Sequence, residues 1–153
     1  MDTIAHLSGL RAAGMALLAV VILFMIGAFS AAYFRTMPLP TEPLEQLTRI
    51  ADDRIGWTAQ AIIFPVAFFA TAIIFGMMAA GLPGSGPRWL AIGATLLLAA
   101  GFVLWLPISL HRLELGANAA EMLRTFDPST TVEVGRTTWT FWPHSLCILA
   151  AIA

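Results

Sequence analysis

The sequence predicts an all-α integral membrane protein: four transmembrane helices in an antiparallel up-down bundle, as one membrane domain over residues 1–153. Two observations on composition lead there. Apolar residues make up 59% of the chain and charged residues 11%, whereas soluble domains carry about 45–50% and about 25%. The third observation is a set of four long charge-free runs. The mean hydropathy of +0.83 agrees with them.

The charge and cysteine content exclude several classes of protein. The net charge is −1, no basic block occurs, and Cys147 is the single cysteine. A nucleic-acid-binding module, a disordered chain and a disulfide scaffold are therefore excluded. The expected partners are the lipid bilayer and other membrane protein subunits or further copies of the chain, and not nucleic acid.

The charge-free runs cover residues 12–34, 55–87, 89–110 and 137–153. At about 1.5 Å per residue, a helix over any of the first three exceeds the roughly 30 Å of hydrocarbon in a bilayer. Backbone amides find no partner in lipid, so each run must be helical. The first run is also too long for the apolar core of a cleaved signal peptide. We therefore expect spans over about 12–34, 55–81 and 89–110.

The fourth run is too short to cross a bilayer by itself. Either the helix begins earlier, or the native chain continues past Ala153. Thr130 and Glu133 fit a capping box, which favours an earlier start and a fourth span over about 131–153.

The connections between the spans differ in character. Residues 82–88 are rich in Gly and Pro and predict a tight turn between neighbouring antiparallel helices. In the third connection, residues 117–126 predict a second short helix, followed by a turn at Asp127 and Pro128.

The first connection predicts an amphipathic helix. Thr41 is the expected N-cap and Pro43 lies just inside the start. Leu44, Leu47 and Ile50 then form one apolar stripe, so we expect this helix to lie at the membrane surface.

Two rules for membrane orientation disagree. Six of the eight Arg lie in the first and third loops, which places those loops in the cytoplasm by the positive-inside rule. The same loops hold eight of the nine acidic residues, and the second connection is the short one. From the short connection we expect both termini to be cytoplasmic, in a bacterial inner membrane.

Small residues at four-residue spacing predict close helix packing. The second span has Ala72, Gly76 and Ala80 at this spacing, which is the clearest such row. Similar rows occur in the first and third spans.

Polar and aromatic residues gather in one leaflet of the predicted bundle, at the ends of spans one and three and the starts of spans two and four. These residues are Tyr33, Trp57, Gln60, Pro65, Trp105, Pro107, Ser109, His111, Trp139, Trp142, Pro143 and His144. One interpretation is an aromatic belt with ordinary proline kinks. The other is a pocket, roofed by the first and third loops, for a lipid-soluble molecule such as a quinone, a carotenoid or a tetrapyrrole.

The candidate cofactor-binding residues are Gln60, Trp105, His111, Trp142 and His144. Imidazoles ligate haem iron, so His111 and His144 are a candidate pair of axial ligands. Their expected depths differ by about 9 Å, however, which argues against a shared iron. No sequence spacing indicates a metal centre of carboxylates and histidines.

Catalytic motifs such as a phosphate-binding glycine loop or a nucleophile elbow do not occur in the sequence. We therefore expect a non-enzymatic protein, an accessory or scaffolding subunit of a larger membrane assembly. The alternative is a membrane redox or cofactor-binding component that uses the His, Trp and Gln side chains for a quinone, haem or pigment.

Overall fold

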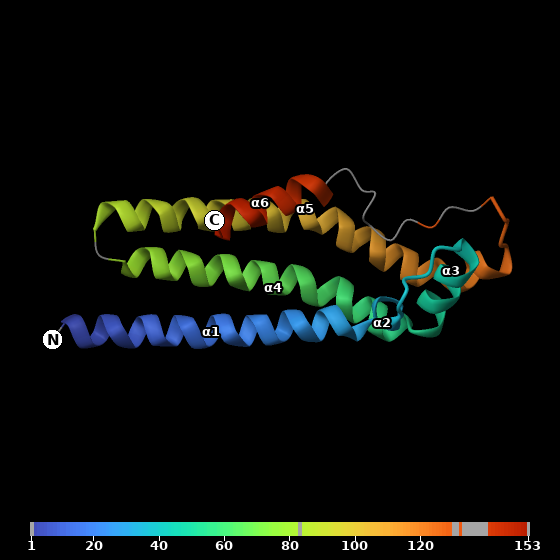
Figure 1. Ribbon diagram of the computed structural model, residues 1–153, viewed down its shortest axis with the longest axis horizontal. Helices are drawn as coiled ribbons and strands as arrows, with labels where there is room; N and C mark the ends of the chain where they lie inside the picture. The colour runs from blue at the N-terminus through green and yellow to red at the C-terminus, as the bar shows by residue number, and fades with distance from the viewer. Residues whose placement is uncertain (1, 83, 130–131, 133–140, 153) are drawn as a thin grey trace.

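The computed structural model describes residues 2–82, 84–129, 132 and 141–152, and side chains within these ranges except at 2–7, 141 and 152 (Figure 1). Its helices are α1 (Asp2–Ser30), α2 (Ala32–Arg35), α3 (Pro43–Asp52), α4 (Arg54–Gly81), α5 (Ser85–Arg124) and α6 (Phe141–Ile152). The described residues contain no β-strand, which confirms the all-α prediction.

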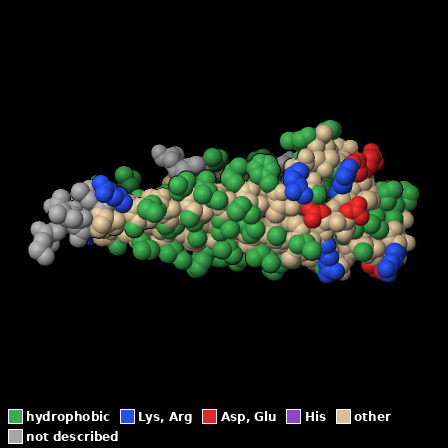
Figure 2. Space-filling model, turned by 90° about the horizontal axis from the view of Figure 1, so that it is seen from below, with side chains coloured by type: hydrophobic (Ala, Val, Ile, Leu, Met, Phe, Trp, Pro, Cys, Tyr) green, Lys and Arg blue, Asp and Glu red, His purple; other side chains and the backbone are tan. Residues whose placement is uncertain are grey.

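Within the described ranges, three helices are long and apolar enough to cross a membrane. They are Ser8–Ser30 within α1, Arg54–Gly81 and Ser85–Arg124. On the face drawn in Figure 2, hydrophobic side chains cover the length of the molecule, and charged side chains gather toward its ends. The predicted fourth span falls partly on residues 131, 133–140 and 153, which lie outside the described residues. Its described part is α6.

The long helices pack as a row of neighbours (Figure 1). α1 packs against α4, α4 against α5, and α5 against α6, whereas the described backbones of α1 and α5 do not approach each other. A glycine allows the contact between α1 and α4, because a Cβ at Gly27 would lie 2.7 Å from Cγ2 of Ile63. Between α4 and α5, a Cβ at Gly76 would lie at the ordinary contact distance of 3.5 Å from Cγ2 of Thr95. The predicted row on α4 is thus confirmed at Ala72, which is buried, but Ala80 is exposed.

The first apolar helix ends at Ser30, earlier than predicted. Ala31 is extended, with φ −83° and ψ 125°, and α2 then begins. The carboxylate of Asp53 explains the break, because its Oδ2 accepts a hydrogen bond of 2.6 Å from the amide of Ala32. Asp53 also caps α4 by accepting from the amide of Gly56 at 3.1 Å, and it lies 3.8 Å from the guanidinium of Arg35. One side chain therefore holds the end of α1 against the start of α4.

We expect Asp53→Ala to lower the free energy of unfolding by about 2 kcal/mol, the upper range for loss of an N-cap, because two helix starts lose their acceptor. Thermal unfolding in detergent followed by circular dichroism measures this. Asp52→Ala is the matched control, since the neighbouring Asp52 is exposed and its loss is expected to cost under about 0.5 kcal/mol. Equal losses in the two variants would contradict the role given to Asp53.

The predicted amphipathic helix is confirmed as α3, with Glu42 as N-cap rather than Thr41, and Pro43 as its first residue. The apolar face of α3 does not lie on the membrane surface, where the sequence predicted it. Leu47 and Ile50 are fully buried against the C-terminal half of α5, in a cluster that also contains Leu115. Protein rather than the membrane surface therefore covers this face, although the predicted Leu44 stays half-exposed.

The helix predicted separately in the third connection is the continuation of α5. The helix runs unbroken past Leu110 because no Gly-Pro turn or cap interrupts residues 111–124. At about 1.5 Å per residue, its 40 residues reach about 60 Å, twice the hydrocarbon thickness. Its second half and α3 lie together at one end of the molecule (Figure 1), where charged side chains of both signs gather (Figure 2), and we call this end the cap. After the helix, the Ser129 amide and hydroxyl donate to Asp127 and hold the pKa of its carboxyl below the ordinary value.

Candidate functional site

The five predicted site residues are only partly brought together. Gln60 on α4, Trp105 on α5 and His144 on α6 are buried. His111 is half-buried on α5. Trp142 is 71% exposed on α6, so it does not join the buried group.

An arginine that the sequence analysis did not single out lies at the centre of this region. Arg112 is 5% exposed, and its Nη1 donates to Oε1 of Gln60 at 3.1 Å. The guanidinium carbon lies 5.2 Å from the ring centre of Phe34, 5.5 Å from that of Trp105 and 5.9 Å from that of Trp57. Such distances place a cation within range of the negative faces of aromatic rings. We use the name Arg112 junction for the group formed by Arg112, Gln60, Phe34, Trp57 and Trp105.

The junction connects α1, α4 and α5 at the point where the cap adjoins the membrane-spanning part of the molecule. Nε2 of Gln60 donates to the carbonyl of Ala28 on α1 at 3.5 Å. Nε1 of Trp57 donates to the carbonyl of Arg112 at 2.6 Å. Gly116 makes room for this indole, because a Cβ there would lie 2.6 Å from Cδ1 of Trp57. Through these bonds α1, α4 and α5 hold one another in register.

His144 belongs to a neighbouring contact on the membrane side of the junction. Its Nδ1 lies 2.7 Å from the carbonyl oxygen of Gly101, and its ring centre lies 4.6 Å from that of Trp105 and 4.9 Å from that of Phe68. Gly101 and His111 are ten residues apart on one helix, or about 15 Å along its axis. Metal–imidazole bonds are about 2.0–2.1 Å long, so His111 and His144 do not form a pair of axial haem ligands in this arrangement.

Two buried polar groups, one in the junction and one next to it, have no hydrogen-bond partner within the described part of the protein. They are Nε1 of Trp105 and Oγ of Ser109, which lie one helical turn apart on the same face of α5. Buried donors are normally satisfied, so these two are the groups most suited to a ligand that accepts hydrogen bonds. No group of three or more His, Cys, Asp or Glu that could hold a metal ion occurs within the described ranges.

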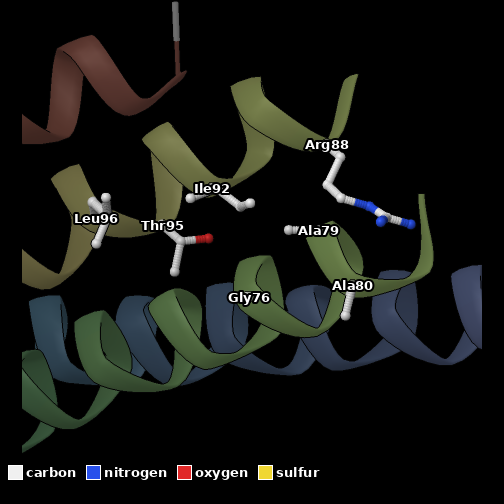
Figure 3. Close-up of a pocket in the computed structure, with 7 residues that line it drawn as sticks. All are labelled: Gly76, Ala79, Ala80, Arg88, Ile92, Thr95 and Leu96. Carbon is white, nitrogen blue, oxygen red and sulfur yellow. The ribbon is translucent and has the colours of Figure 1, made fainter. Parts of the chain in front are cut away.

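Two cavities among the described residues lie toward the opposite end of the molecule from the cap. The α4–α5 groove has a volume of about 420 Å³ and is lined by Gly76, Ala79, Ala80, Arg88, Ile92, Thr95 and Leu96 (Figure 3). The α1–α4 groove has about 620 Å³ and is lined by Gly9, Leu10, Ala12, Ala13, Ala16, Ile74, Met77, Met78 and Gly81. None of the five predicted site residues lines either groove.

Comparison with protein families, with curated proteins and with solved structures finds no match to this chain.

The spacing of Arg112 in the sequence could have indicated its importance. Trp105, Ser109, Arg112 and Gly116 recur at three- and four-residue intervals, which places them on one helical face. That signal appears only when α5 is continued beyond its charge-free run.

Proposed function

We propose that this chain is a four-span, antiparallel membrane protein that serves as a non-enzymatic accessory or scaffolding subunit of a larger membrane assembly. The observation that carries the proposal is the scant coverage of α1. Only 6% of its most apolar stretch is buried, against 28% for α4, and α4 is the one long helix in the described part against which it packs. A helix held along one side offers its other sides to another subunit or a second copy.

The polar residues of the Arg112 junction support the same proposal. Arg112 donates to Gln60, Gln60 donates to the carbonyl of Ala28, and Trp57 donates to the carbonyl of Arg112. Interhelical hydrogen bonds of this kind stabilise packing in lipid. They give these side chains a structural role without any ligand.

The proposed orientation has both termini in the cytoplasm of a bacterial inner membrane. Segments 8–20 and 70–100 at the turn end contain Arg11 and Arg88 and no acidic residue. The cap end contains charges of both signs, such as Asp53 and Arg35. With Asp2 of α1 included, the turn end still has two Arg against one acidic residue, which fits the anionic cytoplasmic leaflet.

Native mass spectrometry after extraction in mild detergent tests the proposed assembly. We expect a complex heavier than one chain, and we expect Ile22→Trp on α1 to release the chain from it. The matched control is Val103→Trp on α5, an equally exposed position, which should leave the complex intact. A wild-type chain that is always recovered alone would contradict the proposal.

A second candidate function is a membrane redox or cofactor-binding component for a quinone, haem or pigment. Trp105 Nε1 and Ser109 Oγ favour a quinone, whose carbonyl oxygen would accept hydrogen bonds from both. Solvent extraction of the purified protein should then yield a quinone absorption spectrum, which Ser109→Ala together with Trp105→Phe would reduce. A colourless preparation that yields no quinone would leave the accessory role as the better proposal.

A further inference from the structure

The α4–α5 groove has the volume of a ligand site. Its volume of about 420 Å³ lies within the roughly 300–1,000 Å³ of known ligand sites. Gly76, Ala79 and Ala80 form its α4 wall, and Ile92 and Leu96 form its α5 wall (Figure 3). The hydroxyl of Thr95 donates to the carbonyl of Ala91 at 2.8 Å, so the side chain adds little free polarity to the lining. The body of the groove is therefore apolar.

One cation lies in the lining of this apolar groove. Arg88, in the first turn of α5, points its guanidinium away from Thr95 and Leu96 and toward the turn end of the helices (Figure 3). Its Nη2 donates to the carbonyl of Leu82 at 3.1 Å, which holds the side chain over the α4–α5 turn. A guanidinium has five N–H donors in a planar fork that matches phosphate oxygens.

Arg88 lies at the level along α5 where lipid headgroups are expected. The next two residues, Trp89 and Leu90, are 71% and 78% exposed and begin the apolar part of α5. Tryptophan is enriched at membrane–water interfaces. The groove thus begins at the interface and continues along the helices into the hydrocarbon.

We propose that the α4–α5 groove binds one anionic phospholipid, with the phosphate on Arg88 and an acyl chain along Gly76, Ala80 and Leu96. This end supplies the charge complementarity, since residues 1–20 and 70–100 contain two Arg and one acidic residue, Asp2, and the only charge among the described residues that line the groove is that of Arg88. This proposal goes beyond the accessory role and does not depend on it.

The test is native mass spectrometry of the delipidated full chain, titrated with phosphatidylglycerol or with phosphatidylcholine that carries the same acyl chains. We expect one phosphatidylglycerol to be retained in preference to phosphatidylcholine. Arg88→Gln should weaken its binding about five-fold, the effect of one arginine at an anionic surface, and Arg88→Lys should recover part of it. Ala80→Leu fills the groove and should weaken both lipids.

Arg11→Gln is the matched control, because Arg11 is exposed at the same end but does not line the groove. Equal loss in Arg11→Gln and Arg88→Gln would overturn the proposal in favour of diffuse charge attraction. Displacement of the lipid by inorganic phosphate would overturn it in favour of a site for phosphate alone. Loss of a protein partner in Ala80→Leu, with lipid binding unchanged, would show that the groove holds protein.

Discussion

Gly56→Ala is expected to lower the free energy of unfolding by about 3 kcal/mol, the upper range for overpacking a close contact. A Cβ at this position would collide with the backbone carbonyl of Ser30 and would lie 2.5 Å from Oδ2 of Asp53. Backbone atoms cannot move aside as the end of a side chain can. The ends of α1 and α4 would therefore separate, and the bond of 3.2 Å from the Ser30 hydroxyl to the Gly56 carbonyl would be lost. Thermal unfolding in detergent measures the change.

Gly93→Ala provides the control for this prediction. A Cβ at Gly93 meets no atom within 4 Å, so alanine there should stabilise α5 by about 0.5–1 kcal/mol through its higher helix propensity. If Gly56→Ala behaves as Gly93→Ala does, then α1 and α4 do not approach each other at Ser30.

Arg112→Ala is expected to destabilise the protein by about 3 kcal/mol, the upper range for a hydrogen bond made by a charged group. The substitution leaves Oε1 of Gln60 buried without its donor and removes the cation from among three aromatic rings. The fluorescence of Trp57 and Trp105 should change in the folded state, because both indoles lie against the guanidinium. Arg124→Ala is the control, since Arg124 is exposed and pairs with Glu121 on the surface, and its loss should cost under about 1 kcal/mol.

A double-mutant cycle separates the Arg112–Gln60 bond from the general loss of packing. In a Gln60→Leu background, Arg112→Ala should cost roughly 1–2 kcal/mol less than in the wild type, because the acceptor is already absent. Strict additivity of the two substitutions would show that the two side chains do not interact.

The membrane-spanning helices could be predicted because their signal is local. A charge-free run longer than the bilayer requires only that lipid offers no hydrogen bonds, and α1, α4 and α5 follow from it. The amphipathic helix α3 followed from Pro43 and the spacing of Leu47 and Ile50. The surface that covers this helix did not, because it comes from a distant part of α5.

The features that the sequence did not predict depend on contacts that a local sequence signal does not contain. Charge ended the predicted third span at Leu110, but a helix ends where its backbone loses partners, and α5 continues to Arg124. Arg112 was therefore counted as a loop cation, although the continuing helix carries it into the interior. Asp53 was likewise unremarkable by sequence, because its bond to the Ala32 amide joins residues 21 positions apart. Trp142 and His144 were grouped by depth alone, and their opposite exposures depend on how α6 is rotated against α5.

Cysteine accessibility tests most directly whether lipid rather than water surrounds these helices. In a Cys147→Ala background, single cysteines replace Ile22 on α1, Phe69 on α4 and Val103 on α5, all exposed apolar positions. Thr41 and Ser129, exposed at the cap end, serve as reference positions. In opened native vesicles, we predict that a water-soluble maleimide labels the two reference positions and leaves the three helix positions unreacted. Labelling of Ile22, Phe69 and Val103 at the reference rate would contradict the account.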